Sequence, residues 1–436
     1  MISFLNKFLK RKKKIILIGI DGVPFTLLKD LIERGKLPFL GKKFKEGIFK
    51  EIYSPLPEIS SVSWSTFMTG KNPGEHGIFG FTDVSNGYNL FFPNFASLRA
   101  EPIWEHLQEK DKKSVIINLP STYPARRING VLISGFVAVD LNRAVFPQNL
   151  LPYLNSIGYK VDVDNSLGKK NIEEFLKDLF DVLEKRFIVA KKLVKDINWD
   201  FFMLTITGSD RLHHFLFKNF LDENSPYHEE FIRYYKKIDD YISDFLMGIK
   251  NDYLLLMMSD HGFTEVRKEV FVNNILFENG FLKFKSHENR SFEGIDFSKT
   301  TAFALDPGRI YLNLRGRFER GKVDGREREK IVSDIKELFY KLNFEGEKII
   351  KNIFEKEEIY EGSFLSVAPD IILQSEDGFD LKASFREIEI FADTHFQGMH
   401  TRENAFFYGD SEFEDLLINV KEVKDVGNLI LDYFEV

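Results

Sequence analysis

The sequence predicts an α/β fold in which a mostly parallel central sheet carries helices on both faces. Four short apolar runs have the length and continuous hydrophobicity of strands that are buried on both faces: Ile15–Ile20, Ser114–Leu119, Phe201–Ile206 and Tyr253–Met258. Segments with apolar residues at helical spacing separate these runs. Strands that alternate with helices imply right-handed crossovers, and therefore a parallel sheet.

Helical patterns are expected at four places. Gly35 and Pro38 are stop signals for the first helix. In the second, Phe175, Leu179 and Leu183 recur at the spacing that places them on one helix face. The four expected helices cover about Phe25–Arg34, Asn171–Val194, His228–Met247 and Arg326–Leu342.

The pattern is less regular between about Thr264 and Asp370. Arg309–Leu314 alternates enough for a strand, and with the helix near Arg326–Leu342 it predicts a small α+β insertion at about residues 265–370, over the site. The mostly polar stretch Lys285–Lys299 is expected to be a loop. The expected organisation is therefore a tail over residues 1–14 and one domain over residues 15–436 that contains this insertion.

Composition excludes several classes of site. The 60 Lys and Arg residues against 67 Asp and Glu give a net charge of −7, which argues against a dedicated nucleic-acid binder, so no stable nucleic-acid partner is expected. The chain has no cysteine, which excludes disulfides, zinc fingers and a thiol nucleophile. A metal site would therefore use histidine, carboxylate or hydroxyl ligands.

Residues 1–14 have apolar residues followed by a basic cluster, the reverse of the order in a signal peptide. We therefore expect a cytoplasmic protein. Ile2, Phe4, Leu5, Phe8 and Leu9 could form an apolar helix face, which would permit weak contact with the inner face of the membrane. The alternative is a solvated basic tail that leads into the first strand.

Acidic residues follow three of the predicted strands. Asp21 follows the first, Asp210 lies shortly after Phe201–Ile206, and Asp260 and His261 follow Tyr253–Met258. Ligands bind beyond the carboxyl ends of parallel strands, so these residues are expected to converge. His214 would share a helix face with Asp210, and His400 lies in Gly398–Arg402. Oxygen and imidazole ligands of this kind suit Zn²⁺, Mn²⁺ or iron.

A hydroxyl-rich segment, Pro57–Gly70, offers a nucleophile. Ser60 precedes a helix expected at about Ser61–Met68, where backbone N–H groups favour an anion. A metal bound to its oxygen would make the alkoxide accessible. The alternative interpretation is that Ser60 only caps this helix.

The ordered set of motifs resembles the alkaline phosphatase superfamily, in its type I phosphodiesterase/nucleotide pyrophosphatase branch, and is most similar to the group described as predicted phosphohydrolases or phosphomutases. The matching segments run in family order and span nearly the whole chain: Ile18–Gly22, Leu37–Leu40 with Gly47, Pro57–Gly70, Asn72–Ile78, Asp210–His214, Ser259–Gly262 and Gly398–His400. The sulfatase branch is excluded, because Ser60 is followed by Ser61-Val62-Ser63-Trp64.

The resemblance implies an alkaline-phosphatase-like fold and two divalent metal ions, Zn²⁺ or alternatively Mn²⁺. One ion would be bound by Asp210, His214 and His400, and the other by Asp21, Asp260 and His261, with the oxygen of Ser60 reaching the metals. The family nucleophile lies four residues before the aromatic that corresponds to Trp64, which selects Ser60 rather than Ser61. Relatives often place an asparagine that binds a phosphate oxygen where Ser63 stands.

The implied function is a two-metal phosphohydrolase that cleaves phosphodiester, pyrophosphate or phosphomonoester bonds of a small substrate through a covalent phosphoserine. One alternative is a phosphomutase or phospho-head-group transferase at the same site. Another is a non-catalytic protein that binds a membrane surface. The oligomeric state is not indicated.

Other polar residues carry weaker expectations. His213 could support its neighbour, His395 is an alternative ligand, and His76 is expected to fix the loop after the nucleophile helix. Arg211 could contact substrate or form a surface ion pair. Arg309, Arg315 and Arg317 could bind an anionic leaving group, but a solvated strand edge is favoured. Trp64 and Phe67 are expected in the core.

Overall fold

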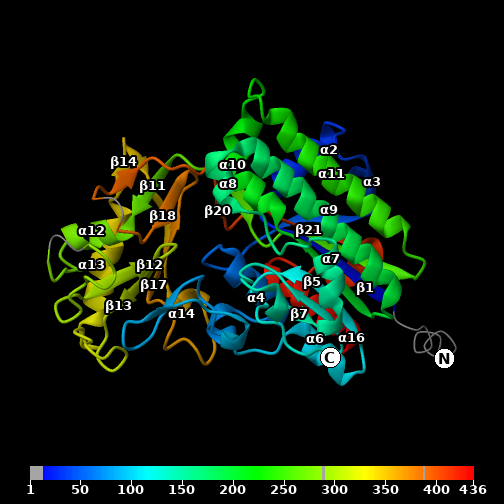
Figure 1. Ribbon diagram of the computed structural model, residues 1–436. Helices are drawn as coiled ribbons and strands as arrows, with labels where there is room; N and C mark the ends of the chain where they lie inside the picture. The colour runs from blue at the N-terminus through cyan, green and yellow to red at the C-terminus, as the bar shows by residue number, and fades with distance from the viewer. Residues whose placement is uncertain (1–12, 287–289, 386–387) are drawn as a thin grey trace.

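Within the residues that the structure describes, an eight-stranded sheet forms the centre of the larger part of the molecule (Figure 1). The structure is a computed structural model that describes residues 13–286, 290–385 and 388–436, so most of the predicted tail lies outside the described residues. The strands run in the order β2 (Gly47–Ile52), β21 (Ala405–Asp410), β9 (Tyr253–Met258), β1 (Lys14–Ile20), β8 (Phe201–Ile206), β5 (Ser114–Leu119), β6 (Gly130–Ser134) and β7 (Val145–Phe146). The four predicted strands are confirmed to within one residue.

The middle of this sheet is parallel. β9, β1, β8, β5 and β6 pair in parallel, whereas β21 pairs antiparallel with both β9 and β2 at one edge, and β7 pairs antiparallel with β6 at the other. The carboxyl ends of β9, β1 and β8 are therefore neighbours at one edge of the sheet, as the sequence predicted.

Helices cover both faces of the sheet, because strands such as β1 have apolar side chains on both sides. Ile16 and Ile18 face one apolar cluster, while Ile15 and Leu17 face the other. The first face packs against α2 (Phe25–Glu33), α3 (Pro38–Glu46), α9 (Ile172–Asp196), α10 (Gly208–Leu221) and α11 (His228–Met247). The second packs against α4 (Ser60–Thr69), α6 (Ile103–Glu109) and α16 (Val423–Phe434). Burial on both faces explains why each strand is a continuous apolar run.

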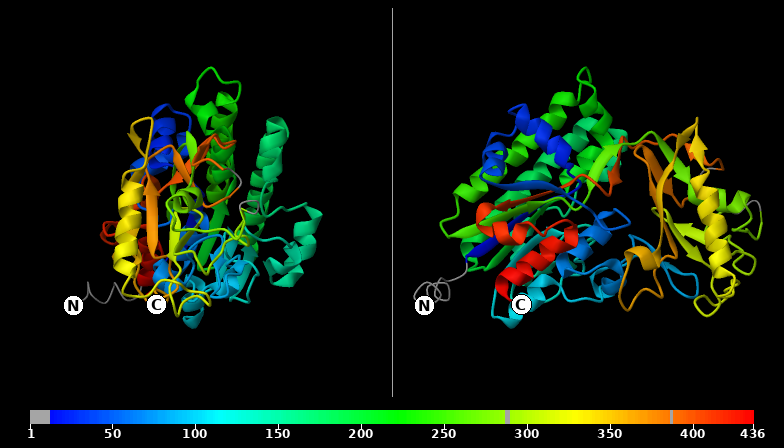
Figure 2. Two further views of the ribbon diagram at one scale, coloured as in Figure 1. Left: turned by 90° about the vertical axis from the view of Figure 1, so that its left-hand side faces the viewer. Right: turned by 180° about the vertical axis from the view of Figure 1, so that it is seen from behind.

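A smaller part of the molecule lies beside the sheet and has an apolar core of its own (Figure 2). It contains the sheets β12-β13-β17-β16 and β18-β11-β19, flanked by α12 and α13. The bounds are β11 (Lys268–Phe271), α12 (Val272–Glu278), β12 (Ala302–Leu305), β13 (Arg309–Leu312), α13 (Arg328–Tyr340), β16 (Ile350–Glu355), β17 (Ile371–Ser375), β18 (Phe379–Lys382) and β19 (Phe391–Ala392). The expected strand at Arg309–Leu314 and helix at Arg326–Leu342 are thus present in shorter form. The division of the chain into a tail, a domain and an insertion stays a prediction.

Short elements join these larger ones. They are α5 (Pro73–His76), β3 (Asp83–Val84), β4 (Leu90–Phe91), α7 (Leu151–Ser156), α8 (Asn165–Lys170), β10 (Gly262–Glu265), β14 (Asn343–Phe344), β15 (Glu347–Lys348), α14 (Lys356–Ile359), β20 (Gly398–Thr401) and α15 (Glu414–Leu417). Among the described residues, no helix is long and apolar enough to cross a membrane.

The three arginines on or shortly after β13 differ in their burial and in their partners. Arg309 is fully buried and donates to the carbonyl oxygens of Thr82 at 2.8 Å and Asp306 at 2.7 Å. The prediction of a solvated strand edge is therefore wrong for Arg309, because the chain around Thr82 covers it. Arg317 pairs with the buried Asp370 at 3.0 Å, and Arg315 is exposed.

His76 fixes the turn that follows α4, as expected. Its ring is fully buried, its Nε2 lies 3.0 Å from Thr66 Oγ1, and its Nδ1 accepts the Ile78 N–H at 3.2 Å. Burial lowers the pKa of His76 to about 3. The folded protein therefore holds the His76 ring in its neutral form.

We expect this burial to make the fold sensitive to acid. Below about pH 6.5 the unfolded chain protonates His76 and the folded chain does not, so this contribution to stability is lost as the pH falls from about 6.5 toward 3. Between pH 6.5 and 5 the loss amounts to about 2 kcal/mol. His76→Asn keeps an acceptor near the Ile78 N–H but does not titrate, so its denaturation midpoint should fall less steeply with pH. Parallel pH curves for the two proteins would contradict this assignment.

Candidate active site

Three neighbouring strand ends place acidic side chains at one point. Asp21 directly follows β1, Asp260 follows β9, and Asp210 lies in the first turn of α10 after β8. Between them, Gly22 has a φ of +66° and donates its N–H to Asp260 Oδ1 at 3.0 Å. A Cβ atom on Gly22 would lie 3.1 Å from the ring of His261 and 3.2 Å from the Asp210 side chain. Glycine thus allows the chain to turn between the acids and leaves them room.

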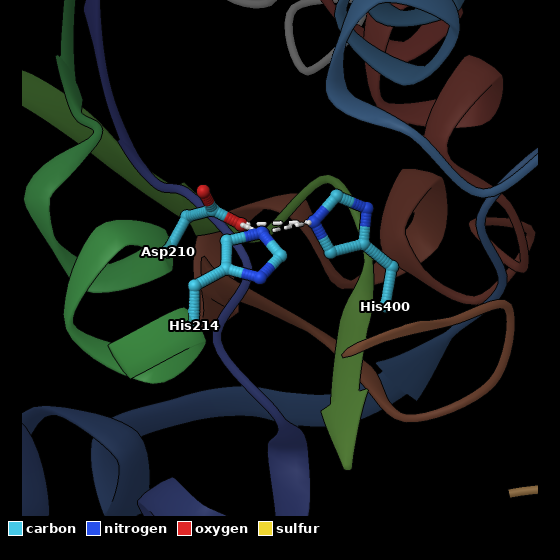
Figure 3. Close-up of side chains that lie close together, drawn as sticks. All are labelled: Asp210, His214 and His400. Carbon is cyan, nitrogen blue, oxygen red and sulfur yellow. Dashed lines mark hydrogen bonds and ion pairs between the residues drawn. The ribbon is translucent and has the colours of Figure 1, made fainter. Parts of the chain in front are cut away.

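Asp210, His214 and His400 form the first ligand cluster, with their side chains pointing toward one another (Figure 3). His400 Nε2 lies 3.0 Å from Asp210 Oδ1 and 3.0 Å from His214 Nε2. Asp210 Oδ1 and His214 Nε2 are 3.5 Å apart. The spacing of four residues on α10 brings Asp210 and His214 together, as predicted.

His400 reaches the cluster from a distant part of the chain. It lies on β20, which pairs antiparallel with β10, and Phe263 on β10 is its register partner. Because β10 begins directly after His261, this pairing also brings the His261 and His400 rings into a stack with centroids 3.8 Å apart.

The three histidines share one orientation. In each ring Nδ1 faces a backbone carbonyl oxygen: His214 that of Gly398 at 3.1 Å, His400 that of Glu58 at 3.0 Å, and His261 that of Gly262 at 3.0 Å. A carbonyl oxygen can only accept, so Nδ1 carries the proton and the Nε2 lone pair faces the cluster. The Nε2 atoms of His214 and His400 thus face each other, and Nε2 of His400 also faces the Asp210 carboxylate, an arrangement that a shared cation would stabilise.

The second cluster contains Asp21, Asp260, His261 and Ser60. His261 Nε2 lies 3.7 Å from Asp21 Oδ1 and 3.4 Å from Asp260 Oδ2. Asp260 Oδ2 is buried and has no hydrogen-bond partner among the described residues. A buried carboxylate oxygen without a donor is costly unless a cation satisfies it. The ligand atoms of Asp21, Asp210 and His261 also lie within 4.8 Å of one another, so these residues fit a second ion next to the first.

Burial sets the electrostatics of these groups. Burial raises the pKa of Asp260 to about 7, and burial followed by the charges of Asp260 and Asp210 raises the pKa of Asp21 well above its usual range. Burial lowers the pKa of His214 to about 4 and that of His261 well below its usual range. Although burial opposes it, the Asp210 carboxylate raises the pKa of His400. Asp21 and Asp260 thus resist ionisation, and His214 and His261 resist protonation. Although burial opposes it, the neighbouring His214, His400 and Arg211 hold the pKa of Asp210 well below its usual range. A divalent cation would favour the ionised carboxylates and the neutral imidazoles, which are the forms that bind metal.

Ser60 is the first residue of α4, and Ile59 is the N-cap. The Ser60 Oγ atom lies 3.2 Å from His261 Nε2 and 3.3 Å from Asp21 Oδ1. The interpretation that Ser60 only caps the helix is therefore wrong, because its hydroxyl faces the second cluster instead of the helix backbone. Ser63 faces elsewhere, with its Oγ 2.7 Å from that of the buried Ser54.

The remaining polar candidates lie around the clusters. His213 supports the Gly22 turn, with Nδ1 2.9 Å from the Gly22 carbonyl oxygen and Nε2 2.7 Å from the Tyr235 hydroxyl. Arg211 bridges Asp210 and Asp162, each at 2.8 Å. Within the described ranges His395 belongs to neither ligand group.

The sequence did not indicate which groups orient the ligands. Trp64 is buried in the core as expected, but its Nε1–H also donates to Asp21 Oδ2 at 2.9 Å. Ser209 Oγ donates to the Asp21 carbonyl oxygen at 2.6 Å. The spacing of four residues between Ser60 and Trp64 places both on one face of α4, which is the signal that could have linked them.

A cavity of about 280 Å³ opens directly beside the first cluster. His214, His400 and Glu58 line it on the side of the large sheet, and residues of the smaller part, including Leu373 and Lys382, line it on the other side. Burial raises the pKa of the Glu58 carboxyl group to about 7.

Comparison with known proteins agrees with this geometry. A family model described as type I phosphodiesterase / nucleotide pyrophosphatase matches residues 15–401. Among solved structures, phosphonoacetate hydrolase from Sinorhizobium meliloti 1021 in complex with phosphonoacetate is similar with a TM-score of 0.63 and 14% identity, covering 97% of this chain and 96% of that one. An inactive form of murine ectonucleotide pyrophosphatase/phosphodiesterase 5 in complex with AMP is similar with a TM-score of 0.56 and 14% identity, covering 98% and 96%. At these identities the solved structures show the fold. No curated protein matches the chain.

We expect Trp64→Phe to weaken metal binding about 10- to 100-fold, because the ring still packs but Asp21 loses the donor that orients it. Competition with a zinc indicator measures this affinity. Trp104→Phe is the matched control, since Trp104 is also buried and its Nε1 has no hydrogen-bond partner among the described residues. Equal affinities for the two variants would contradict the role of Trp64.

We expect Asp260→Asn to lower the amount of metal that the protein retains after dialysis. The amide can still accept the Gly22 N–H but contributes no charge to the second cluster. Asp239→Asn is the control, since Asp239 is another buried carboxylate that accepts two backbone N–H groups, those of Phe39 and Leu40. Metal analysis that finds no loss in Asp260→Asn would remove Asp260 from the ligand set.

Proposed function

Because the chain belongs to the type I phosphodiesterase / nucleotide pyrophosphatase family, and is thus a metal-dependent phosphoric ester hydrolase, we propose that it cleaves small phosphate esters with Ser60 as nucleophile. The observation that carries this proposal is the position of Ser60 Oγ, 3.2 Å from His261 Nε2 and 3.3 Å from Asp21 Oδ1. It is a buried hydroxyl beside a metal-ligand set, at the start of a helix.

Two clusters would hold two divalent cations. Asp210, His214 and His400 would bind one, and Asp21, Asp260 and His261 would bind the other, with the Ser60 hydroxyl beside the second. Three imidazoles together with carboxylates favour Zn²⁺, and Mn²⁺ is the alternative. When bound, the cations supply charge neutralisation at the phosphate oxygens and lower the pKa of a coordinated hydroxyl.

Residues at the start of α4 carry out the attack and bind the phosphate. The Ser60 oxygen attacks phosphorus, the bond from phosphorus to the leaving oxygen breaks, and the phosphoryl group is held as a serine ester. Water then attacks that phosphorus, the Ser60–phosphorus bond breaks, and the serine hydroxyl is restored. The N–H of Ser61 at the start of α4 would donate to a nonbridging oxygen of the phosphate.

The leaving group would lie in the cavity beside His214 and His400. This cavity adjoins the ligand clusters and opens toward the smaller part of the molecule, so its lining would determine which esters are accepted. The nucleophile and the leaving-group side thus come from different parts of the structure.

We expect Ser60→Ala to lower turnover of bis-p-nitrophenyl phosphate or of the monoester p-nitrophenyl phosphate by at least about 1,000-fold, a loss of roughly 4 kcal/mol of transition-state stabilisation. The metal content of the variant should stay close to that of the wild type. Assays with added Zn²⁺ and Mn²⁺ test the metal assignment at the same time.

Ser63→Ala is the matched control, since it removes a hydroxyl from the same helix that contacts Ser54 rather than the clusters. It should retain most of the activity. Turnover of Ser60→Ala at the wild-type rate would move the nucleophile elsewhere, and metal-loaded wild type that hydrolyses neither ester would refute the proposed function.

A further inference from the structure

We propose that the substrate's leaving group carries an apolar chain, which runs from the metal-ligand clusters along a path of two connected cavities to an exposed hairpin. This inference rests on the proposed function for the position of the phosphate. It adds the chemical class of the ester, an amphiphilic phosphate rather than a nucleotide or a sugar phosphate.

The inner cavity, of about 280 Å³, has a largely apolar lining. Its polar end is the side of His214, His400 and Glu58, where the phosphate would bind. The apolar side chains that surround the rest are Ile59, Phe81, Pro307, Leu373, Leu381 and Met399. A leaving group that enters this space would exchange water for hydrocarbon contacts.

The charged groups of the inner cavity are already paired. Among the described lining residues, Lys382 is the one lysine or arginine, and its Nζ lies 2.6 Å from Asp380. The Asp306 carboxylate accepts the Ala383 N–H. Among its described lining residues, the inner cavity therefore offers no unpaired lysine or arginine that could bind a second phosphate or a carboxylate of the ligand. The carboxylates of Asp306 and Asp380 would repel such an anionic group.

A second cavity, of about 590 Å³, adjoins the inner one. The two cavities share Thr82 and Asp306 in their linings. The apolar residues of the outer cavity are Leu90, Phe292, Ala304, Leu305, Ala383 and Phe385. Its charged residues, besides Asp306, are Arg290 and Glu293, and the Arg290 guanidinium lies over the Phe277 ring at 4.7 Å. An extended chain that leaves the inner cavity past Thr82 would thus meet apolar side chains again.

The path ends at the β3–β4 hairpin, which exposes three consecutive large apolar side chains. Leu90 and Phe91 are each 42% exposed, and Phe92 is 74% exposed. Tyr88 of the same hairpin is buried against the smaller part and donates to Asn313 Oδ1 at 2.8 Å, so the hairpin is held in place. An exposed apolar run on an anchored hairpin is typical of a binding surface, because it contributes nothing to the core.

The proposal predicts a chain-length series. Each methylene group that becomes buried should strengthen binding by about fourfold, until the chain extends beyond the hairpin. Ligands of equal charge but different chain length therefore separate this path from the phosphate site itself.

The test is calorimetric binding of n-alkylphosphonates, from methyl to dodecyl, to the Zn²⁺-loaded full chain below their micelle concentrations. We expect the dissociation constant to fall at least about 100-fold across the series. AMP, whose leaving group is polar, should bind more weakly than the octyl compound. A dissociation constant that does not change with chain length, or tighter binding of AMP, would overturn the proposal.

Two variants localise the effect. Leu90→Asn and Phe92→Asn should each reduce the gain between the butyl and dodecyl compounds by about tenfold. Met247→Asn is the matched control for Phe92→Asn, since Met247 has the same 74% exposure but lies at the end of α11 and not on the hairpin. A full gain in both hairpin variants would refute the path.

The binding experiment does not depend on turnover. If alkylphosphonates bind with the expected dependence on chain length while neither p-nitrophenyl ester is hydrolysed, the proposed function fails and the apolar path stands. If the esters are hydrolysed and the series is flat, the function stands and the path fails.

Discussion

The structure depends on a set of buried acids and bases that are unfavourable neighbours until a cation lies between them. Asp21, Asp210 and Asp260 follow adjacent strands of one sheet, and the Nε2 atoms of three histidines face the same space. Burying like charges costs several kcal/mol per group when no counter-charge is present. The ladder hydrogen bonds of β9, β1 and β8 and the apolar packing on both faces hold these side chains together. A divalent metal ion at the carboxyl ends of these strands would therefore stabilise side chains that the fold already holds close together.

The parts of the fold that could be predicted are those that depend on local pattern. Continuous apolar runs indicated the strands, and acids at their ends indicated the candidate ligands, because parallel strands place their carboxyl ends together. Contacts between distant segments could not be predicted in this way. Arg309 was expected at a solvated edge, but the chain around Thr82 covers it. The capping interpretation of Ser60 was open until the positions of Asp21 and His261 were known. The bond from Trp64 to Asp21 likewise depends on how α4 packs on β1.

The two parts of the molecule contribute different chemistry to one site. The large sheet and α4 supply acids, imidazoles and a hydroxyl, which are held by hydrogen bonds to backbone groups and to one another. The smaller part and the β3–β4 hairpin supply apolar side chains to both cavities, together with charged groups such as the Lys382–Asp380 pair. A phosphate would therefore be recognised by the rigid edge of the sheet, whereas the group attached to it would be recognised by loops and strands with a separate core.

The pairing of β10 with β20 has a consequence for how such a protein can diversify. These strands fix His261 and His400 next to each other although more than 130 residues separate them in the sequence, and the smaller part leaves and re-enters through this two-stranded junction. Since the junction closes the intervening loop by its own hydrogen bonds, the length of that loop has little influence on the ligands, and lengthening it costs only a slowly growing closure entropy. Changes in the intervening segment would thus alter the lining of the cavities, while β10 and β20 keep His261 and His400 next to each other.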